Sequence, residues 1–254
     1  MNGLKKDIRS GKVTIGTWVT IGHPEISEIL STLPFDWLVF DMEHAPLDVG
    51  VVEVLMMPLR GTNITPLVRI PWNDLVIIKR VLDIGAYGLI IPWVNTRDDV
   101  ENALKACKYP PRGLRGVGPR RCIMYGAYDV KRYYEVFEDE LIIAIQAETK
   151  AALDNLEEIL SVKGVDIVFI GPNDLSASLG VFREFNHPKF LEALTTVIKT
   201  CRNMETTPGI MAYNLNQARK YIEMGFKFIS IANDAVMMRS IFNEILTSLK
   251  TQSN

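Results

Sequence analysis

The chain has 254 residues, of which 48% are apolar, so it can bury a sizeable core as one large domain or two small ones. Its formal charge is −2, from 28 basic and 30 acidic side chains, so no overall attraction to nucleic acid or to an anionic membrane is expected. No apolar run approaches the roughly 18 residues that span a bilayer. The polar start, residues 1–12, also lacks the apolar stretch of a signal peptide. The cysteines are odd in number and have no metal-type spacing, which is typical of reduced thiols in the cytoplasm.

Short apolar runs alternate with longer helical patterns along the chain. The predicted strands are Thr14–Val19, Trp37–Asp41, Pro66–Ile70, Gly88–Pro92, Leu141–Gln146, Asp166–Ile170, Pro208–Met211 and Phe228–Ala232. The predicted helices are Pro24–Leu33, Asp48–Arg60, Asp74–Ile84, Arg97–Lys108, Lys150–Ser161, Pro188–Met204, Asn214–Met224 and Ala235–Leu249. This alternation indicates a (β/α)₈ TIM barrel, formed as a single domain over residues 1–254. A doubly wound open sheet is the competing fold, but no Gly-x-Gly-x-x-Gly follows the first strand, so a dinucleotide-binding version is not expected.

One segment interrupts the regular spacing, between the fourth helix and the fifth strand. The loop near residues 109–128 is rich in Gly, Pro and Arg, and its basic side chains include Arg112, Arg115, Arg120 and Arg121. Long loops of this kind are usually functional lids or linkers. These arginines suit either an anionic substrate or a subunit contact, and the sequence does not choose between the two.

Two successive strands each end close to a carboxylate. Glu148 follows the fifth strand and Asp174 follows the sixth, one strand–helix–strand unit later. In a parallel barrel the C-terminal ends of the strands meet on one face. Two carboxylates on that face suit a hard divalent cation such as Mg²⁺ or Mn²⁺. The alternative is that each residue caps the helix that follows it, near Lys150 and Leu175.

Other strand ends carry further candidate residues. Asp41 and His44 follow the second strand, where the carboxylate is expected to fix the tautomer of the imidazole; a structural His is the alternative. Arg69 ends the third strand, where its guanidinium suits either an anionic substrate or a buried ion pair. The backbone amides of Gly171–Asp174 open a helix and suit a second anionic oxygen. Trp18 lies at the end of the first strand and Met211 at the end of the seventh, where each either lines a pocket or belongs to the core.

Six segments occur in a diagnostic order: Asp41–His44, Pro66–Pro71, Leu82–Gly88, Tyr109–Gly116, Gln146–Glu148 and Gly171–Ser176. Together they resemble the HpcH/HpaI aldolases, which are class II, metal-dependent pyruvate aldolases. The resemblance runs from near Gly16 to Ser178 and continues more loosely to the C-terminus. It implies a pyruvate-binding barrel, a cytoplasmic carbon–carbon lyase that joins pyruvate to an aldehyde or cleaves 4-hydroxy-2-oxo acids, and Mg²⁺, Mn²⁺ or Co²⁺ as cofactor. It also implies a homohexamer, and the apolar stripe of helix Ala235–Leu249 suits packing on its own barrel or on a neighbour's.

The resemblance implies a role for each matching position on the pyruvate side. Glu148 and Asp174 bind the metal, and Arg69 contacts the ketone or enolate oxygen of pyruvate. The pyruvate carboxylate is held by backbone amides in the segment Pro172, Asn173 and Asp174. Gln146 lines the same pocket.

The remaining implied roles concern proton transfer and the neighbouring subunit. His44, oriented by Asp41, acts as the acid/base through a metal-bound water. Asp83 matches a residue that family members present across a subunit interface to a neighbour's active site. The segment Pro119–Cys122 departs from the small residues expected there, which leaves the aldehyde side of the pocket unassigned.

The chemistry of these residues agrees with the metal route. No Lys lies at a strand end in the six segments, so a Schiff-base aldolase is not expected. A metal and Arg69 both place positive charge where the enolate's negative charge develops. Two other functions stay open: a related lyase that uses the same enolate, such as an oxaloacetate decarboxylase or a lyase of acyl-CoA esters, and a non-catalytic 2-oxo acid sensor. A sensor needs no His44, so the pairing of His44 with Asp41 argues against it.

Overall fold

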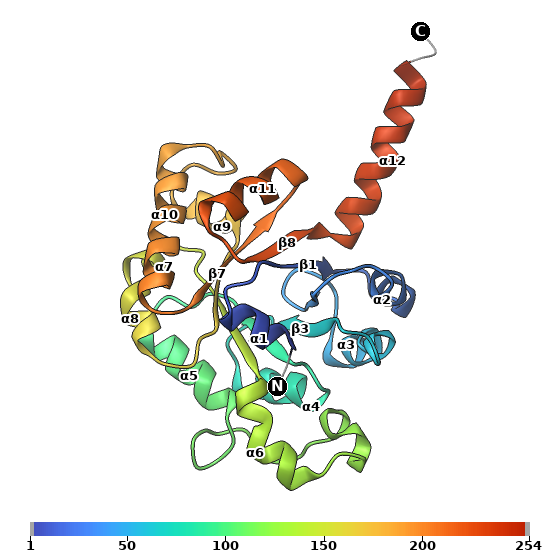
Figure 1. Cartoon of the computed structure of the whole chain (residues 1–254), viewed down its shortest axis with the longest axis vertical. Helices are drawn as coiled ribbons and strands as arrows, with labels where there is room; N and C mark the ends of the chain where they lie inside the picture. The colour runs from blue at the N-terminus through green and yellow to red at the C-terminus, as the bar shows by residue number, and fades with distance from the viewer. Residues whose placement is uncertain (1–2, 252–254) are drawn as a thin grey trace.

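The computed structural model describes residues 3–251 and forms a closed barrel of parallel strands with helices outside it (Figure 1). The strands are β1 (Thr14–Val19), β2 (Trp37–Asp41), β3 (Thr65–Arg69), β4 (Gly88–Ile91), β5 (Ile142–Gln146), β6 (Ile167–Ile170), β7 (Thr207–Ala212) and β8 (Phe228–Asn233). Each strand pairs with the next in sequence, and β8 closes onto β1. The predicted (β/α)₈ barrel is confirmed, and every strand lies within one residue of its predicted bounds.

The helices follow the predicted alternation with additions and breaks. They are α1 (Gly3–Arg9), α2 (Pro24–Ser31), α3 (Val49–Leu55), η1 (Met57–Leu59), α4 (Leu75–Asp83), α5 (Arg97–Cys107), η2 (Arg121–Gly126), α6 (Val130–Glu140), α7 (Lys150–Asp154), α8 (Leu156–Ser161), α9 (Pro172–Ser178), α10 (Pro188–Asn203), α11 (Leu215–Met224) and α12 (Asp234–Thr251). The predicted helix 48–60 breaks before Pro58, which has no N–H to donate. The predicted helix 150–161 divides at Asn155, whose backbone lies outside the helical region.

Helix α1, which the sequence did not predict, closes the amino-terminal end of the barrel. Its Leu4 and Ile8 belong to the apolar cluster inside the barrel. Its buried Lys5 donates to the carbonyl of Leu141 and lies 3.2 Å from the carboxylate of Asp166, just before β5 and β6 begin. The opposite, carboxyl-terminal end of the barrel is therefore the end left for a site.

The barrel interior is filled by large aromatic rings. Trp37 and Phe228 stack with ring centroids 3.9 Å apart, and Phe169 meets Phe228 edge-on. Gly16 makes room for this stack, because a Cβ at that position would lie 2.2 Å from the Trp37 ring. The barrel is thus packed solid below its mouth.

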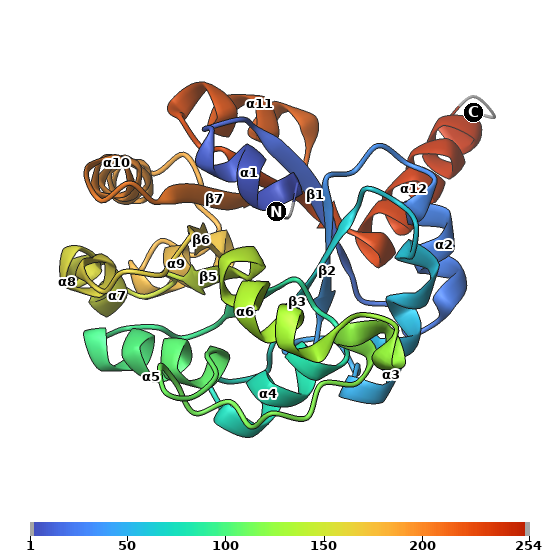
Figure 2. The same ribbon diagram turned by 60° about the horizontal axis from the view of Figure 1, so that its bottom comes forward.

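The Arg-rich loop lies at the amino-terminal end, because α5 runs antiparallel to the strands and delivers the chain there. Arg115 is fully buried between the rings of Tyr109 and Phe137, at 4.6 and 4.4 Å, and donates to Asp83 at 2.6 Å. Figure 2 shows α6, which follows this loop, in front of the barrel strands, with α4 and α5 lower in the view. Arg115 is therefore a structural residue and does not serve the strand C-termini of its own chain.

Helix α12 projects away from the barrel (Figure 1). Asp234 fixes its start, because its carboxylate accepts from the backbone amides of Thr20 and Ile21 at 2.9 and 3.0 Å. Beyond Asp234, the side chains of α12 are exposed. Of the two alternatives predicted for its apolar stripe, packing on its own barrel is therefore not observed, and packing on a neighbour's barrel stays a prediction. No helix between residues 3 and 251 is long and apolar enough to cross a membrane.

Candidate active site

Arg69 and Asp41 form the centre of one side of the barrel mouth. The register of β2 and β3 sets them side by side. The guanidinium donates through Nε to Oδ1 at 2.9 Å and through Nη2 to Oδ2 at 2.7 Å, and it lies 4.4 Å from the Trp18 ring. Both side chains are buried. The buried ion pair, which was the alternative prediction for Arg69, is present. Three of the five N–H groups of the guanidinium, two on Nη1 and one on Nη2, are not used by Asp41.

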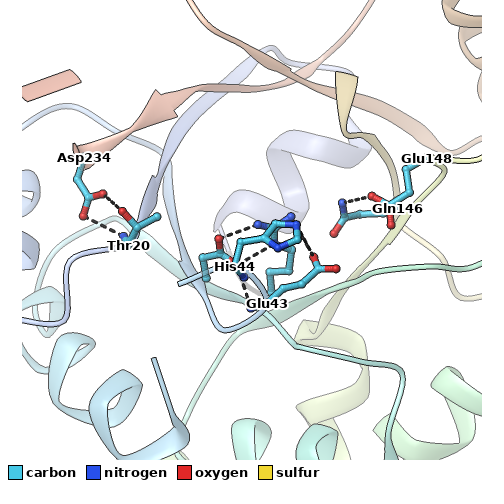
Figure 3. Close-up of polar contacts among 8 residues, drawn as sticks. Thr20, Glu43, His44, Gln146, Glu148 and Asp234 are labelled. Carbon is cyan, nitrogen blue, oxygen red and sulfur yellow. Dashed lines mark hydrogen bonds and ion pairs between the residues drawn. The ribbon is translucent and has the colours of Figure 1, made fainter. Parts of the chain in front are cut away.

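The sequence predicted that Asp41 orients the imidazole of His44, but in the structure Asp41 has other partners. Its Oδ1 accepts from the backbone amides of Glu43 and His44, at 3.0 and 3.3 Å, and its remaining capacity goes to Arg69. The nearest carboxylate to the imidazole is Glu43, with 3.9 Å between His44 Nε2 and Glu43 Oε2 (Figure 3). The His44 side chain is 63% exposed, so it is accessible to a ligand at the mouth.

Glu148 lies across the mouth from His44 (Figure 3) and is buried. Its Oε1 accepts from the backbone amide of Trp93 at 3.0 Å, and its Oε2 accepts from Gln146 Nε2 at 2.7 Å. The cap of α7 is Thr149, whose side chain accepts from Ala152. The alternative prediction that Glu148 is a helix cap is therefore wrong.

Asp174 and Glu148 converge on the space beside Gly171. A Cβ on Gly171 would lie 3.3 Å from Glu148 Oε2, 3.4 Å from Asp174 Oδ2 and 3.6 Å from Gln146 Nε2. Asp174 lies in the first turn of α9, which begins at Pro172 rather than near Leu175, so it does not cap that helix either. The buried oxygens Gln146 Oε1 and Asn173 Oδ1 have no hydrogen-bond partner in the described part of the chain.

The mouth carries an excess of negative charge. The pKa of Glu148 is raised to about 7, chiefly by burial and also by the charges of Glu43 and Asp174, against the opposing effects of the Trp93 amide and Arg69. Burial also raises the pKa of Glu43, which lies 3.1 Å from Arg69 Nη1. The mouth thus holds four carboxylates, and Arg69 forms ion pairs with only two of them. The four are Asp41, Glu43, Glu148 and Asp174. Such a surplus favours a bound cation.

Three other predicted residues lie in different surroundings. Trp18 is buried and touches Arg69, while Met211 packs partly buried against the cluster inside the barrel. Asp83 ends α4 at the amino-terminal end, where it binds Arg115. Within one chain it therefore lies at the opposite end of the barrel from His44.

Sequence analysis missed two residues of the site. Glu43 lies inside the Asp-Met-Glu-His segment, and a third carboxylate there was a signal available from the sequence. Trp93 contributes its backbone amide from the loop after β4, with φ of 54°. Nothing in the sequence marks that amide, because the contact depends on an unusual backbone conformation.

Comparisons with known proteins point to one family of aldolases. The HpcH/HpaI aldolase/citrate lyase model matches residues 14–240. A protein named 5-keto-4-deoxy-D-glucarate aldolase from Shigella boydii is 36% identical over 250 residues, covering 98% of this chain and 96% of that protein. The crystal structure of an HpcH/HpaI aldolase/citrate lyase family protein from Burkholderia cenocepacia superposes with a TM-score of 0.93 at 30% identity, covering 98% of this chain and 100% of that one. The crystal structure of an HpcH/HpaI aldolase from Desulfitobacterium hafniense superposes with a TM-score of 0.92 at 28% identity, covering 97% of this chain and 96% of that one.

Fold, site and family model define a carbon–carbon lyase of the class II pyruvate aldolase type, which acts on small molecules and uses a divalent metal. The chain belongs to the HpcH/HpaI aldolase/citrate lyase family. The family and the reaction class predicted from the six segments are confirmed.

Proposed function

We propose that this protein adds pyruvate reversibly to an aldehyde, forming or cleaving a 4-hydroxy-2-oxo acid, with Mg²⁺, Mn²⁺ or Co²⁺ held by Glu148 and Asp174. The observation that carries the proposal is the convergence of these two carboxylates beside Gly171, next to the unpartnered Gln146 Oε1. The names of the 36% identical relatives support a keto-deoxy sugar diacid as substrate.

The donor set fits a hard divalent cation. Glu148 and Asp174 offer carboxylate oxygens, and Gly171 leaves the space between them free of any side chain. No group of three or more His, Cys, Asp or Glu between residues 3 and 251 is arranged to hold a metal. The protein would therefore supply two ligands, and substrate and water the others. The cation, when bound, withdraws electron density from the ketone oxygen of pyruvate.

Arg69 and the start of α9 would hold the other parts of pyruvate. Asp41 fixes the guanidinium of Arg69 through two bonds, so its remaining N–H groups are oriented before the ketone oxygen arrives. Among residues 3–251 no side chain caps the start of α9, which leaves the first amides after Pro172 available for a carboxylate oxygen.

His44 is the proposed acid/base. It takes a proton from the methyl group of pyruvate and returns it to the oxygen of the aldehyde after the carbon–carbon bond forms. Its exposure at the mouth and its distance of 3.9 Å from Glu43 support this role, because an accessible imidazole next to a carboxylate can carry the proton.

The protein is proposed to assemble as a homo-oligomer, with a hexamer as the expected size. Exposed apolar side chains along α12 support assembly, among them Ile241, Phe242, Ile245 and Leu246. Asp83 would serve a neighbour's site, because it lies at the wrong end of the barrel to meet its own. The free cysteines Cys107, Cys122 and Cys201 support a cytoplasmic location.

The test is exchange of the pyruvate methyl protons with D₂O in the absence of any aldehyde, followed by NMR. Exchange that stops in EDTA and returns with Mg²⁺ or Mn²⁺ is the expected result. Glu148→Gln and Asp174→Asn should each abolish it, while Asp154→Asn, an exposed carboxylate on α7, serves as the matched control. Exchange that persists in metal-free protein would contradict the proposal.

A further inference from the structure

Two exposed tryptophans stand at the mouth of the barrel. Trp72 follows β3 and is 58% exposed, and Trp93 follows β4 and is 48% exposed. Their ring centroids lie 6.4 Å apart with the planes tilted by 33°. The other two tryptophans, Trp18 and Trp37, are buried. An exposed pair of such large apolar rings is unusual on a protein surface and indicates a surface for binding.

The pair is joined directly to the candidate active site. The backbone amide of Trp93 donates to Glu148 Oε1 at 3.0 Å, and Trp72 lies three residues after Arg69. Strands β3, β4 and β5 are neighbours in the barrel, so both rings arise between the proposed cation ligand and the proposed oxyanion partner. The surface is thus continuous with the place where pyruvate would react.

The backbone of Trp93 is held in a conformation that a bulky residue rarely adopts. Its φ is 54°, a left-handed conformation that persists for a bulky residue only where surrounding contacts enforce it. Those contacts are the bond to Glu148 and a bond from Asn95 Nδ2 to the Trp93 carbonyl at 3.1 Å. The same conformation that delivers the amide to Glu148 directs the indole to the mouth, where it meets Trp72.

We propose that Trp72 and Trp93 form an aromatic wall for the acceptor aldehyde, and that the enzyme accepts aldehydes bearing an aromatic ring. This inference rests on the proposed function and adds a second class of acceptor to it, beside the aldehyde that forms part of a keto-deoxy sugar diacid. The methyl carbon of pyruvate bonds to the aldehyde carbon, and the proton removed from the methyl group is returned to the new hydroxyl. No atom is lost and no oxidant is needed. Stacking of a substrate ring on the wall favours this acceptor over an aldehyde of similar reactivity without a ring.

The kinetic test compares kcat/KM for benzaldehyde with kcat/KM for glycolaldehyde, both with pyruvate and Mg²⁺. Trp72→Ala should lower the benzaldehyde value by about threefold to tenfold, the worth of one aromatic contact, and leave the glycolaldehyde value within about twofold. Trp72→Phe should recover most of the loss. Tyr87→Ala, which removes an exposed aromatic ring at the opposite end of the barrel, is the matched control. An equal loss of kcat/KM for both aldehydes, or no loss for either, would refute the proposal that the two tryptophans bind the aldehyde.

Two further measurements separate this inference from the proposed function. The pyruvate exchange reaction needs no aldehyde, so its absence in the wild type would refute the proposed function alone. Binding of benzaldehyde is then still measured by quenching of tryptophan fluorescence, corrected for absorption by the aldehyde, because only Trp72 and Trp93 of the four tryptophans are exposed. Quenching that is unchanged in Trp72→Ala would overturn the inference. A change in oligomeric state on substitution, without a change in selectivity, would also overturn it and assign the pair to a subunit contact.

Discussion

Glu148→Gln should make the metal-free protein more stable at pH 8 while abolishing the proposed activity. Glu148 has a pKa of about 7 in the folded chain against a reference value of 4.5. Because each pKa unit corresponds to about 1.36 kcal/mol, ionised Glu148 destabilises the metal-free fold by about 3 kcal/mol. Glutamine cannot ionise, but its NH2 group takes the place of one of the two carboxylate oxygens, which accept separately from Trp93 and Gln146. One lost hydrogen bond costs about 1 kcal/mol, which leaves a net gain of about 2 kcal/mol.

The sign of the pH dependence follows from the direction of the pKa shift. Below pH 4.5 the carboxyl of Glu148 is protonated in both folded and unfolded chains and does not penalise the fold. Between pH 4.5 and 7 the unfolded chain releases the proton while the folded chain keeps it, so the free energy of unfolding falls as pH rises. Above pH 7 the penalty is complete. The stability gain of the Gln variant should therefore be present at pH 8 and absent at pH 4.5.

The assay is urea unfolding in EDTA at pH 5 and pH 8, at one fixed protein concentration because assembly affects apparent stability. Adding Mg²⁺ at pH 8 should raise the midpoint of the wild type and leave that of the variant unchanged. Asp154→Asn is the control for removal of an exposed carboxylate. A variant no more stable than the wild type at pH 8 would refute the view of Glu148 as a buried carboxylate that requires a cation.

Four further predictions concern the site and the assembly. His44→Ala should lower turnover by roughly 10²–10⁴-fold with little change in pyruvate affinity, and near-wild-type rates would make His44 structural. Asp41→Asn should raise KM for pyruvate, because it loosens the guanidinium of Arg69; an unchanged KM in initial-rate assays would contradict this. Gly171→Ala should weaken Mn²⁺ binding, measured by electron paramagnetic resonance, because its methyl group enters the space between the two carboxylates; unaltered binding would move the cation elsewhere. Light scattering should show an oligomer that Ile241→Lys weakens, whereas a fully active wild-type monomer would exclude a shared site.

The barrel was predictable because its strands are short apolar runs in the sequence. The candidate site residues lie at or directly after the C-terminal ends of these runs. Glu148 and Asp174 were placed at one end of the barrel from strand order alone, and their oxygens do face one point beside Gly171. Helix α1 was missed because only Leu4 and Ile8 mark its buried face, and its partners lie inside a barrel formed by the rest of the chain. Patterns within a short polar segment do not contain that information.

The partners of individual side chains were less predictable than their positions. Sequence spacing suggested that Asp41 holds the imidazole of His44, since the two are close along the chain. The register of β2 and β3 instead brings Asp41 beside Arg69, 28 positions away. The Asp41 carboxylate forms two hydrogen bonds with the guanidinium, and this bidentate contact replaces the predicted contact with the imidazole. Register is a property of the closed sheet, so a motif read along one strand does not reveal it.

The arrangement of charge is the reason why we propose that a cation, rather than Arg69, balances Glu148. Asp41 takes two of the five donor bonds of the guanidinium and Glu43 lies 3.1 Å from a third nitrogen, so the positive charge of Arg69 is already shared by two carboxylates. Glu148 and Asp174 have no ion pair with a basic side chain within residues 3–251. Glu148 is buried, and an ionised carboxylate buried without such a partner is costly. A divalent cation bound beside it would remove that cost. Affinity for the cation and instability of the metal-free fold are thus two measures of the same electrostatic energy, and a substitution that relieves the second should weaken the first.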